Sequence, residues 1–66
     1  MPFITIQHLP GRTLEQRRQF ARKITEAAVE VFSTPAEKVR IVFHEISKDD
    51  LARGGVLASD EGSTTR

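Results

Sequence analysis

The sequence predicts an α+β protein: one β-α-β unit with parallel strands, followed by a short C-terminal hairpin. Two segments, residues 2–9 and 39–46, are rich in β-branched residues and alternate between two faces, as strands do. A stretch of about twenty residues with helical periodicity separates them. Because a crossover through a helix returns the chain in its original direction, the strands are expected to be parallel in a right-handed unit.

The helix is expected to begin at Thr13, after a turn at residues 10–11 that proline and glycine favour. Thr13 and Gln16 form a capping-box pattern, in which the threonine side chain accepts a backbone N–H and the glutamine reaches back to the cap. Apolar residues recur at helical spacing and predict one buried stripe: Phe20, Ile24, Ala27, Ala28 and Val31.

Prolines and glycines mark the later connections. The helix is expected to end near Ser33, because Thr34 precedes Pro35 and a residue before proline avoids the helical region. Thr34 is then expected to cap one short helical turn that has Pro35 at its first position. A Gly-Gly pair at residues 54–55 predicts the hairpin turn, and residues 60–66, which have no apolar member, are expected to form a flexible tail.

Length and composition predict a single self-associating domain over residues 1–66. The chain has no cysteine, 38% hydrophobic residues and a formal net charge of +1. A core of this size rarely supplies more than about 3–5 kcal/mol of stability without disulfides or a metal. One helix also covers only one face of a two-stranded sheet, so the other face and the edges need a partner. An obligate oligomer follows from both arguments.

The same composition argues against several classes of protein. A net charge of +1 gives no electrostatic case for a nucleic-acid partner. The longest apolar stretches, such as residues 41–43, are far too short to cross a membrane. The first residues lack the basic segment and long apolar run of a signal peptide, so a cytoplasmic location is expected by default.

Pro2 is the first candidate catalytic residue. If Met1 is removed, Pro2 presents a secondary amine that is both a base and a nucleophile. An α-amine titrates near about 8, and nearby cations with apolar surroundings would lower the pKa of the Pro2 nitrogen further. A free base at neutral pH suits proton abstraction next to a carbonyl. Proline at the second position is common, so a catalytic role for Pro2 requires support from other residues.

Two arginines supply that support. Arg12 directly follows the first strand, and Arg40 lies within the second strand, on the face opposite Val39, Ile41 and Phe43. A guanidinium among apolar residues is costly unless it meets an anion, which is either a partner carboxylate at an interface or a ligand. Guanidinium forks match carboxylate and enolate oxygens with two parallel donors. A base with two such forks is typical of a site that enolises an acid.

Four segments of the sequence resemble the 4-oxalocrotonate tautomerase family over residues 2–59. They are Met-Pro-Phe-Ile-Thr-Ile at the start, Leu-Pro-Gly-Arg-Thr-Leu-Glu-Gln before the helix, Lys-Val-Arg-Ile-Val-Phe-His-Glu in the second strand, and Gly-Gly-Val-Leu-Ala near the end. The resemblance implies a homohexamer, a trimer of dimers, with active sites between subunits. It also implies 1,3-proton transfer in unsaturated 2-oxo or 2-hydroxy acids, as in aromatic hydrocarbon catabolism, with no metal or organic cofactor.

The resemblance also implies a role for each matching residue. Pro2 resembles the family's N-terminal proline, the general base, which requires the loss of Met1. Arg40 resembles the arginine that contacts the 2-oxygen and the near carboxylate of the substrate and stabilises the charge of the dienol. Arg12 resembles the arginine that holds the distal carboxylate, and Leu9 is expected to line the substrate site.

Two positions depart from the family pattern. Leu51 stands where the family enzyme has an aromatic residue, and Arg53 stands where it has an aliphatic one. Both positions belong to the apolar wall near the proline. Arg53 would bring a third cation towards Pro2, lowering the pKa of its amine or recruiting another anionic group, unless it is a solvated loop residue that points away.

Other functions remain open at this point. A non-catalytic oligomeric module that binds a ligand would explain the altered wall, and related hydratases or dehalogenases use a carboxylate to activate water. Asp49 and Asp50 are candidates for that carboxylate, although a polar turn explains them better. His8 and His44 lie on separate strands without a carboxylate partner, so no metal site is expected. A solvated helix face is the preferred interpretation of the basic residues Arg17, Arg18, Arg22 and Lys23.

Overall fold

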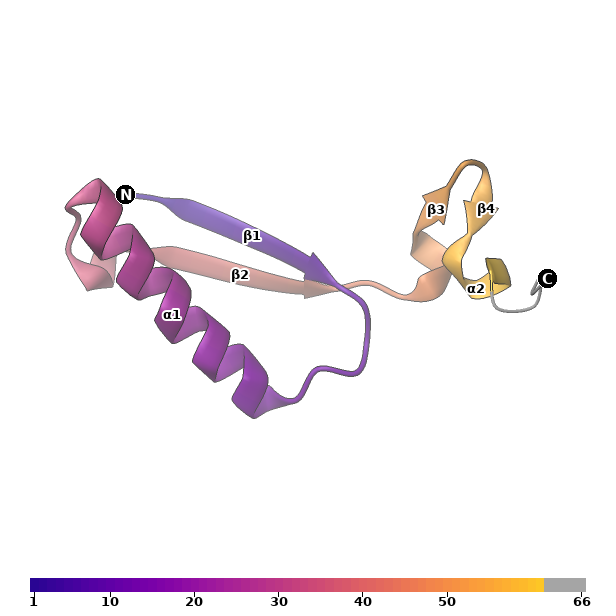
Figure 1. Ribbon diagram of the computed structural model, residues 1–66, viewed down its shortest axis with the longest axis horizontal. Coiled ribbons are helices and arrows are strands. Elements are labelled where there is room, and N and C mark those ends of the chain that lie inside the picture. The colour runs from indigo at the N-terminus through magenta and orange to yellow at the C-terminus, as the bar shows by residue number, and fades with distance from the viewer. Residues whose placement is uncertain (62–66) are drawn as a thin grey trace.

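The chain folds as the expected parallel β-α-β unit, with a separate hairpin at its C-terminal side. The computed structural model describes residues 1–61. Strand β1 (Phe3–His8) pairs in parallel with β2 (Arg40–Glu45), from Phe3 opposite Arg40 to His8 opposite Glu45. Helix α1 (Leu14–Phe32) joins the two strands and lies across one face of their sheet (Figure 1). The predicted fold class is confirmed.

Both ends of α1 are formed by the residues that the sequence indicated. The backbone N–H of Gln16 donates to Thr13 Oγ1 at 3.1 Å, and the Thr13 N–H donates to Gln16 Oε1 at 3.0 Å. At the other end, the Ser33 N–H donates to the carbonyl of Val29 at 3.0 Å. Ser33 has φ 57° and ψ 43°, in the left-handed region that glycine usually occupies at this position.

The predicted cap of the following turn is not formed. The short helix η1 (Ala36–Lys38) has Pro35 as its N-cap and no side-chain capping bond. Pro35 has ψ 146°, which is extended rather than helical, so the turn begins one residue later than expected. Thr34 therefore lies too far back to cap η1, and its hydroxyl is not used there.

The Gly-Gly pair forms the hairpin turn as predicted. Strands β3 (Ala52–Arg53) and β4 (Val56–Leu57) pair antiparallel across residues 54–55. Gly54 and Gly55 both have positive φ, 63° and 83°, which is the conformation that a two-residue turn of this type requires.

Two short helical turns flank this hairpin. Helix η2 (Lys48–Asp50) begins at Ser47, whose side chain caps it, and α2 (Ala58–Glu61) follows β4 directly. The predicted tail, residues 60–66, therefore does not include Asp60 and Glu61, which are helical. Residues 62–66 of that segment lie outside the described residues.

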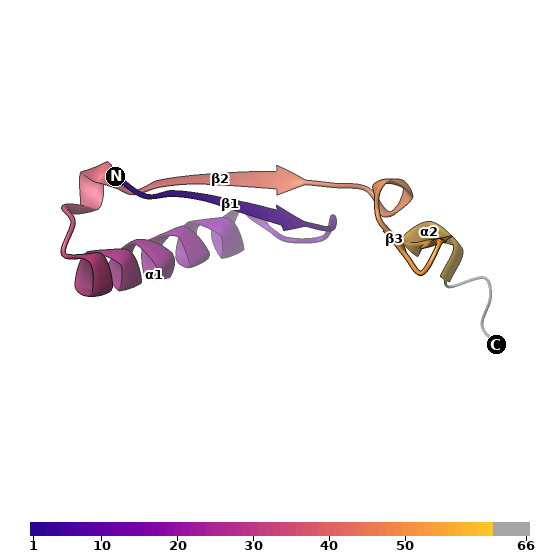
Figure 2. The ribbon, with the colours of Figure 1, turned by 90° about the horizontal axis from the view of Figure 1, so that it is seen from above.

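A single chain encloses almost no core of its own. Helix α1 covers only one side of the sheet, and the hairpin extends beyond the sheet's end (Figure 2). Among the described residues, Ala28 is the only buried hydrophobic one, whereas Phe3 and Val42 on the uncovered face are 74% and 55% exposed. The radius of gyration is 15.8 Å, while a compact domain of this length has about 11 Å. The apolar surface of this chain is therefore arranged for contact with other chains.

Candidate active site

Pro2 and Arg40 lie together where both strands begin. The backbone N–H of Arg40 donates to the carbonyl oxygen of Pro2 at 3.0 Å. This proximity follows from the parallel topology, because the crossover through α1 returns the chain to the end of the sheet from which it started. The N-terminus and the start of β2 are accordingly adjacent in Figure 1. The predicted base and one predicted arginine are thus neighbours within one chain.

The Arg40 side chain lies on the sheet face that α1 leaves uncovered. Arg40 pairs with Phe3, and both residues are exposed, whereas Ile4 and Ile41 on the opposite face are partly covered. Among the described residues, Arg40 forms neither a salt bridge nor a side-chain hydrogen bond. With respect to residues 1–61, its guanidinium is therefore available to bind an anion that lies over the start of the sheet.

A hollow of about 480 Å³ adjoins Pro2. Its walls are the first two residues of the chain, the last residue of α1 and the segment that follows it: Met1, Pro2, Phe32, Ser33, Thr34 and Pro35. No local sequence pattern indicated this wall. The available signal was topological, because in a parallel unit the end of the helix returns to the end of the sheet where the first strand begins.

Met1 bears directly on whether Pro2 acts as a base. In the full chain the Pro2 nitrogen is part of the peptide bond with Met1, and an amide nitrogen is not basic. Met1 is 60% exposed and also lines the hollow. Its removal would create the amine and widen the hollow at the same place.

Arg12 and Leu9 lie at the opposite end of β1 from Pro2. Six residues of extended strand separate the two ends by about 20 Å. Arg12 is exposed and lines a different groove, of about 340 Å³, together with His8, Phe20 and Phe43. Within one chain, the structure does not bring Arg12 and Pro2 into one site.

The hairpin residues are also distant from Pro2. Leu51 is 41% exposed, and Arg53 lies exposed on β3. The hairpin projects beyond the end of the sheet that is far from the N-terminus (Figure 1). A wall made by Leu51 and Arg53 therefore cannot enclose Pro2 of the same chain.

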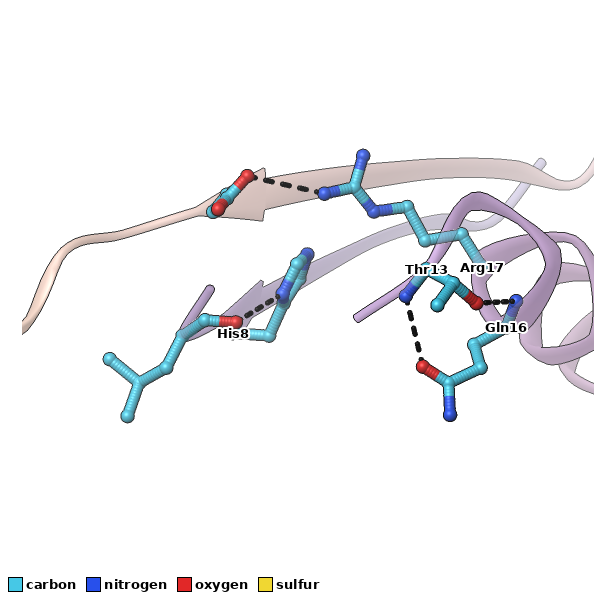
Figure 3. A network of polar contacts seen from close by, with 6 residues as sticks. His8, Thr13, Gln16 and Arg17 are labelled. Atoms are coloured by element: carbon cyan, nitrogen blue, oxygen red, sulfur yellow. Dashed lines mark hydrogen bonds and ion pairs between the residues drawn. The ribbon is translucent and has the colours of Figure 1, made fainter. Parts of the chain in front are cut away.

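An ion pair joins α1 to the far end of the sheet. Arg17 Nη2 donates to Glu45 Oε1 at 3.3 Å, beside His8, whose Nδ1 bonds to the carbonyl of Leu9 at 2.9 Å (Figure 3). The side chain of Arg17 is 33% exposed, so this residue does not belong to a fully solvated helix face as predicted. The strand order explains the difference, because β2 ends opposite the first turns of α1 and presents Glu45 there. Arg18 does fit the prediction, since it is exposed and pairs with Glu15.

The remaining candidate groups lie in structural positions. Asp50 Oδ2 accepts hydrogen bonds from the backbone N–H and the hydroxyl of Ser47 at 3.4 and 3.2 Å, and the Asp49 N–H donates to Ser47 Oγ. The Asp50 carboxylate therefore stabilises a turn, to which Asp49 contributes its backbone N–H. His8 and His44 lie on opposite faces of the sheet. Residues 1–61 contain no cluster of three or more side chains suited to hold a metal, and no helix among them is long and apolar enough to cross a membrane.

Comparison with protein families narrows the classes of protein that the geometry leaves open. The family model described as tautomerase enzyme matches residues 2–61, nearly the whole described chain. The chain belongs to the tautomerase family. Membership supports isomerase activity of the tautomerase kind.

Individual relatives of this tautomerase support the same assignment. A 2-hydroxymuconate tautomerase from Bacillus subtilis (strain 168) is 40% identical over 60 residues, which cover 91% of this chain and 97% of the relative. A 4-oxalocrotonate tautomerase isozyme from Methylibium petroleiphilum has a TM-score of 0.88 at 32% identity, with 94% of this chain and 97% of that chain covered. A heterohexamer 4-oxalocrotonate tautomerase from Chloroflexus aurantiacus J-10-fl has a TM-score of 0.84 at 30% identity, with 92% and 98% covered.

Proposed function

We propose that this tautomerase converts unsaturated 2-hydroxy acids of the 2-hydroxymuconate kind into their 2-oxo tautomers, with Pro2 as general base after loss of Met1. The observation that carries the proposal is the pairing of Pro2 with Arg40, whose backbone groups are hydrogen bonded at 3.0 Å at the start of the sheet. It places the main chain of Pro2, whose nitrogen becomes an amine once Met1 is lost, beside the main chain of Arg40. The exposed guanidinium of Arg40 has no anionic partner among the described residues.

The proposed reaction uses Pro2 for proton transfer and Arg40 for charge. The Pro2 nitrogen accepts the proton of the 2-hydroxyl group and returns it to a carbon of the conjugated system, so that the enol becomes a ketone and no atom is gained or lost. Negative charge develops on the 2-oxygen while the proton is on the nitrogen. The Arg40 guanidinium stabilises that charge and the neighbouring carboxylate through charge-assisted hydrogen bonds.

The distal carboxylate requires a second chain. Arg12 lies about 20 Å from Pro2 along β1, which exceeds the length of a six-carbon acid. We therefore infer that Arg12 of another copy completes each site and that Leu51 and Arg53 reach it from a neighbouring hairpin. A homohexamer built as a trimer of dimers provides such contacts. The heterohexamer from Chloroflexus aurantiacus J-10-fl supports a hexameric assembly, although its subunits are of more than one kind.

Kinetics on processed protein test the proposal. Intact-mass spectrometry first establishes that Met1 is absent, and ketonisation of 2-hydroxymuconate and phenylenolpyruvate is then followed by absorbance. We expect Pro2→Ala to lower kcat/KM by at least about a hundredfold, since general-base catalysis contributes on that scale. A second variant retains Pro2 but carries an additional, uncleaved residue before it. This variant blocks the amine without changing the proline ring, and it should be equally impaired.

The outcome separates an enzyme from a binding module. Ketonisation no faster than in buffer, or equal rates for the processed protein and both variants, would show that Pro2 is not a catalytic base. A non-catalytic oligomeric module that binds the acid would then be the better description of the chain.

A further inference from the structure

The hydroxyl group of Thr34 is a polar group beside Pro2 that the fold does not use. Thr34 is half-buried and lines the hollow of about 480 Å³ that Pro2 also lines. No hydrogen bond links its hydroxyl to another residue in the part of the chain that the structure describes. The capping role that its sequence position suggested is absent, because η1 begins after Pro35. A half-buried donor without a structural partner is suited to bind a ligand.

The backbone before Thr34 adopts an unusual conformation that brings it to this position. Ser33 has φ 57°, a left-handed conformation that side chains other than glycine rarely adopt. The residue ends α1 and directs the chain from the helix layer back towards the start of β1 (Figure 1). The conformation is that of a left-handed helix C-cap, in which the Ser33 N–H donates to the carbonyl of Val29.

Apart from Thr34, the hollow has few side-chain groups that could form a hydrogen bond with a ligand. Its other side-chain walls from this segment are Phe32 and Pro35, which are apolar, and Ser33, which is exposed. In a largely apolar site, one placed donor fixes the orientation of a ligand. In the proposed function the 2-hydroxyl group of the substrate lies at Pro2, which lines this hollow, whereas Arg40 does not line it.

We propose that Thr34 donates a hydrogen bond from Oγ1 to an oxygen at the 2-hydroxy acid end of the substrate and orients that end at Pro2. The inference rests on the proposed function and adds to it a specificity-determining residue from the same chain as the base. Substrates that share this end depend on Thr34 equally, whatever their distal group.

A pair of substitutions at Thr34 tests the inference. Thr34→Val removes the hydroxyl but keeps the branched shape, whereas Thr34→Ser keeps the hydroxyl and removes a methyl group. A hydrogen bond to a charged group corresponds to about a tenfold to hundredfold change in kcat/KM. We expect that loss in Thr34→Val for both 2-hydroxymuconate and phenylenolpyruvate, and rates within about threefold of the original protein in Thr34→Ser.

Each other outcome contradicts a defined part of the inference. Equal losses in the valine and serine variants would show that packing, not the hydroxyl, matters at Thr34. A loss confined to 2-hydroxymuconate would assign Thr34 to the distal carboxylate instead. If Thr34→Val disturbs the turn, as thermal unfolding would reveal, Thr34→Ala replaces it in the comparison with serine.

A matched control and a reference variant isolate the effect. Thr25→Val makes the same chemical change at a half-buried site within α1 that lines neither hollow, and its activity should be unchanged. Pro2→Ala reports on the proposed function separately. Full activity of Thr34→Val alongside an inactive Pro2→Ala would overturn this inference alone, whereas an active Pro2→Ala would overturn the proposed function.

Discussion

Arg40 has two separate roles, one in strand pairing and one as a charged group. Its main chain holds β2 to β1 through Pro2, and its side chain projects from the face that α1 leaves open. Because only the side chain meets the proposed substrate, Arg40→Gln should leave the strand pairing intact. We expect kcat/KM for 2-hydroxymuconate to fall by about a hundredfold to a thousandfold, the usual cost of losing one donor to a developing oxyanion.

Arg18→Gln is the matched control for this prediction. Arg18 is an exposed arginine whose guanidinium pairs only with Glu15 on the same helix, and such surface pairs contribute little. Steady-state kinetics of both variants, with circular dichroism to verify the fold, provide the measurement. Similar activity of Arg40→Gln and Arg18→Gln would exclude Arg40 from stabilising the reacting oxygen.

At the residue scale, strand order determines the mutual position of two candidate residues that the sequence indicated. Pro2 and Arg40 each precede or begin a strand, and parallel pairing necessarily brings such residues together. Thr34 and Arg17 were interpreted wrongly because their surroundings depend on three-dimensional contacts. Where η1 begins depends on the ψ angle of Pro35, and the partner of Arg17 is Glu45, twenty-eight positions away.

At the scale of elements, α1 depends on its capping box. Thr13 and Gln16 satisfy each other's backbone N–H groups at 3.1 and 3.0 Å, and both residues are exposed. Thr13→Ala removes the acceptor and leaves the Gln16 N–H to water. We expect a loss of about 1 kcal/mol in the free energy of unfolding. Urea denaturation at one fixed protein concentration measures it, since the stability of an assembly varies with concentration.

Gln19→Ala provides the reference for that measurement. Gln19 is exposed on the same helix and has no side-chain hydrogen bond within residues 1–61, so its substitution should change stability by less than about 0.5 kcal/mol. Equal effects of the two substitutions would mean that the capping box contributes nothing beyond the helix propensity of alanine.

Local signals predicted the elements well because each one is encoded within a few residues. The helix start, the helix end and the Gly-Gly hairpin all required only neighbouring residues. The helical turn of Asp60 and Glu61 was not predicted, because four residues without an apolar pattern give no periodic signal. The hairpin lies beyond the end of the sheet (Figure 2). This placement could not be predicted from the sequence either, because no local pattern fixes the direction of a connection.

At the scale of the whole molecule, the distribution of the candidate residues and the lack of a core have one explanation. Pro2 and Arg12 lie at opposite ends of β1, and the hairpin lies beyond the sheet. Phe3 and Val42 leave the uncovered sheet face apolar and exposed. Contact between copies would bury this face and join the separate ends into complete sites. The sequence could predict that a partner is needed, but the register of that contact is a property of the assembly.

A substitution that disrupts contact through the uncovered face should therefore abolish both assembly and activity. Val42 is 55% exposed at the middle of β2 and lies outside the proposed catalytic set. Val42→Glu places a charge where apolar contact is expected, and burial of an unpaired carboxylate is strongly unfavourable. We expect the dissociation constant of the assembly to rise by at least about tenfold, which corresponds to the loss of one buried valine.

Sedimentation velocity and kinetics over one dilution series measure both properties. Activity per chain should fall over the same concentration range in which the assembly dissociates, because a separated chain retains Pro2 and Arg40 but lacks the Arg12 of its neighbour. Val42→Thr keeps the branched shape without charge and should remain assembled and active. A dissociated Val42→Glu chain with full activity would show that one chain suffices and that the site is not shared between copies.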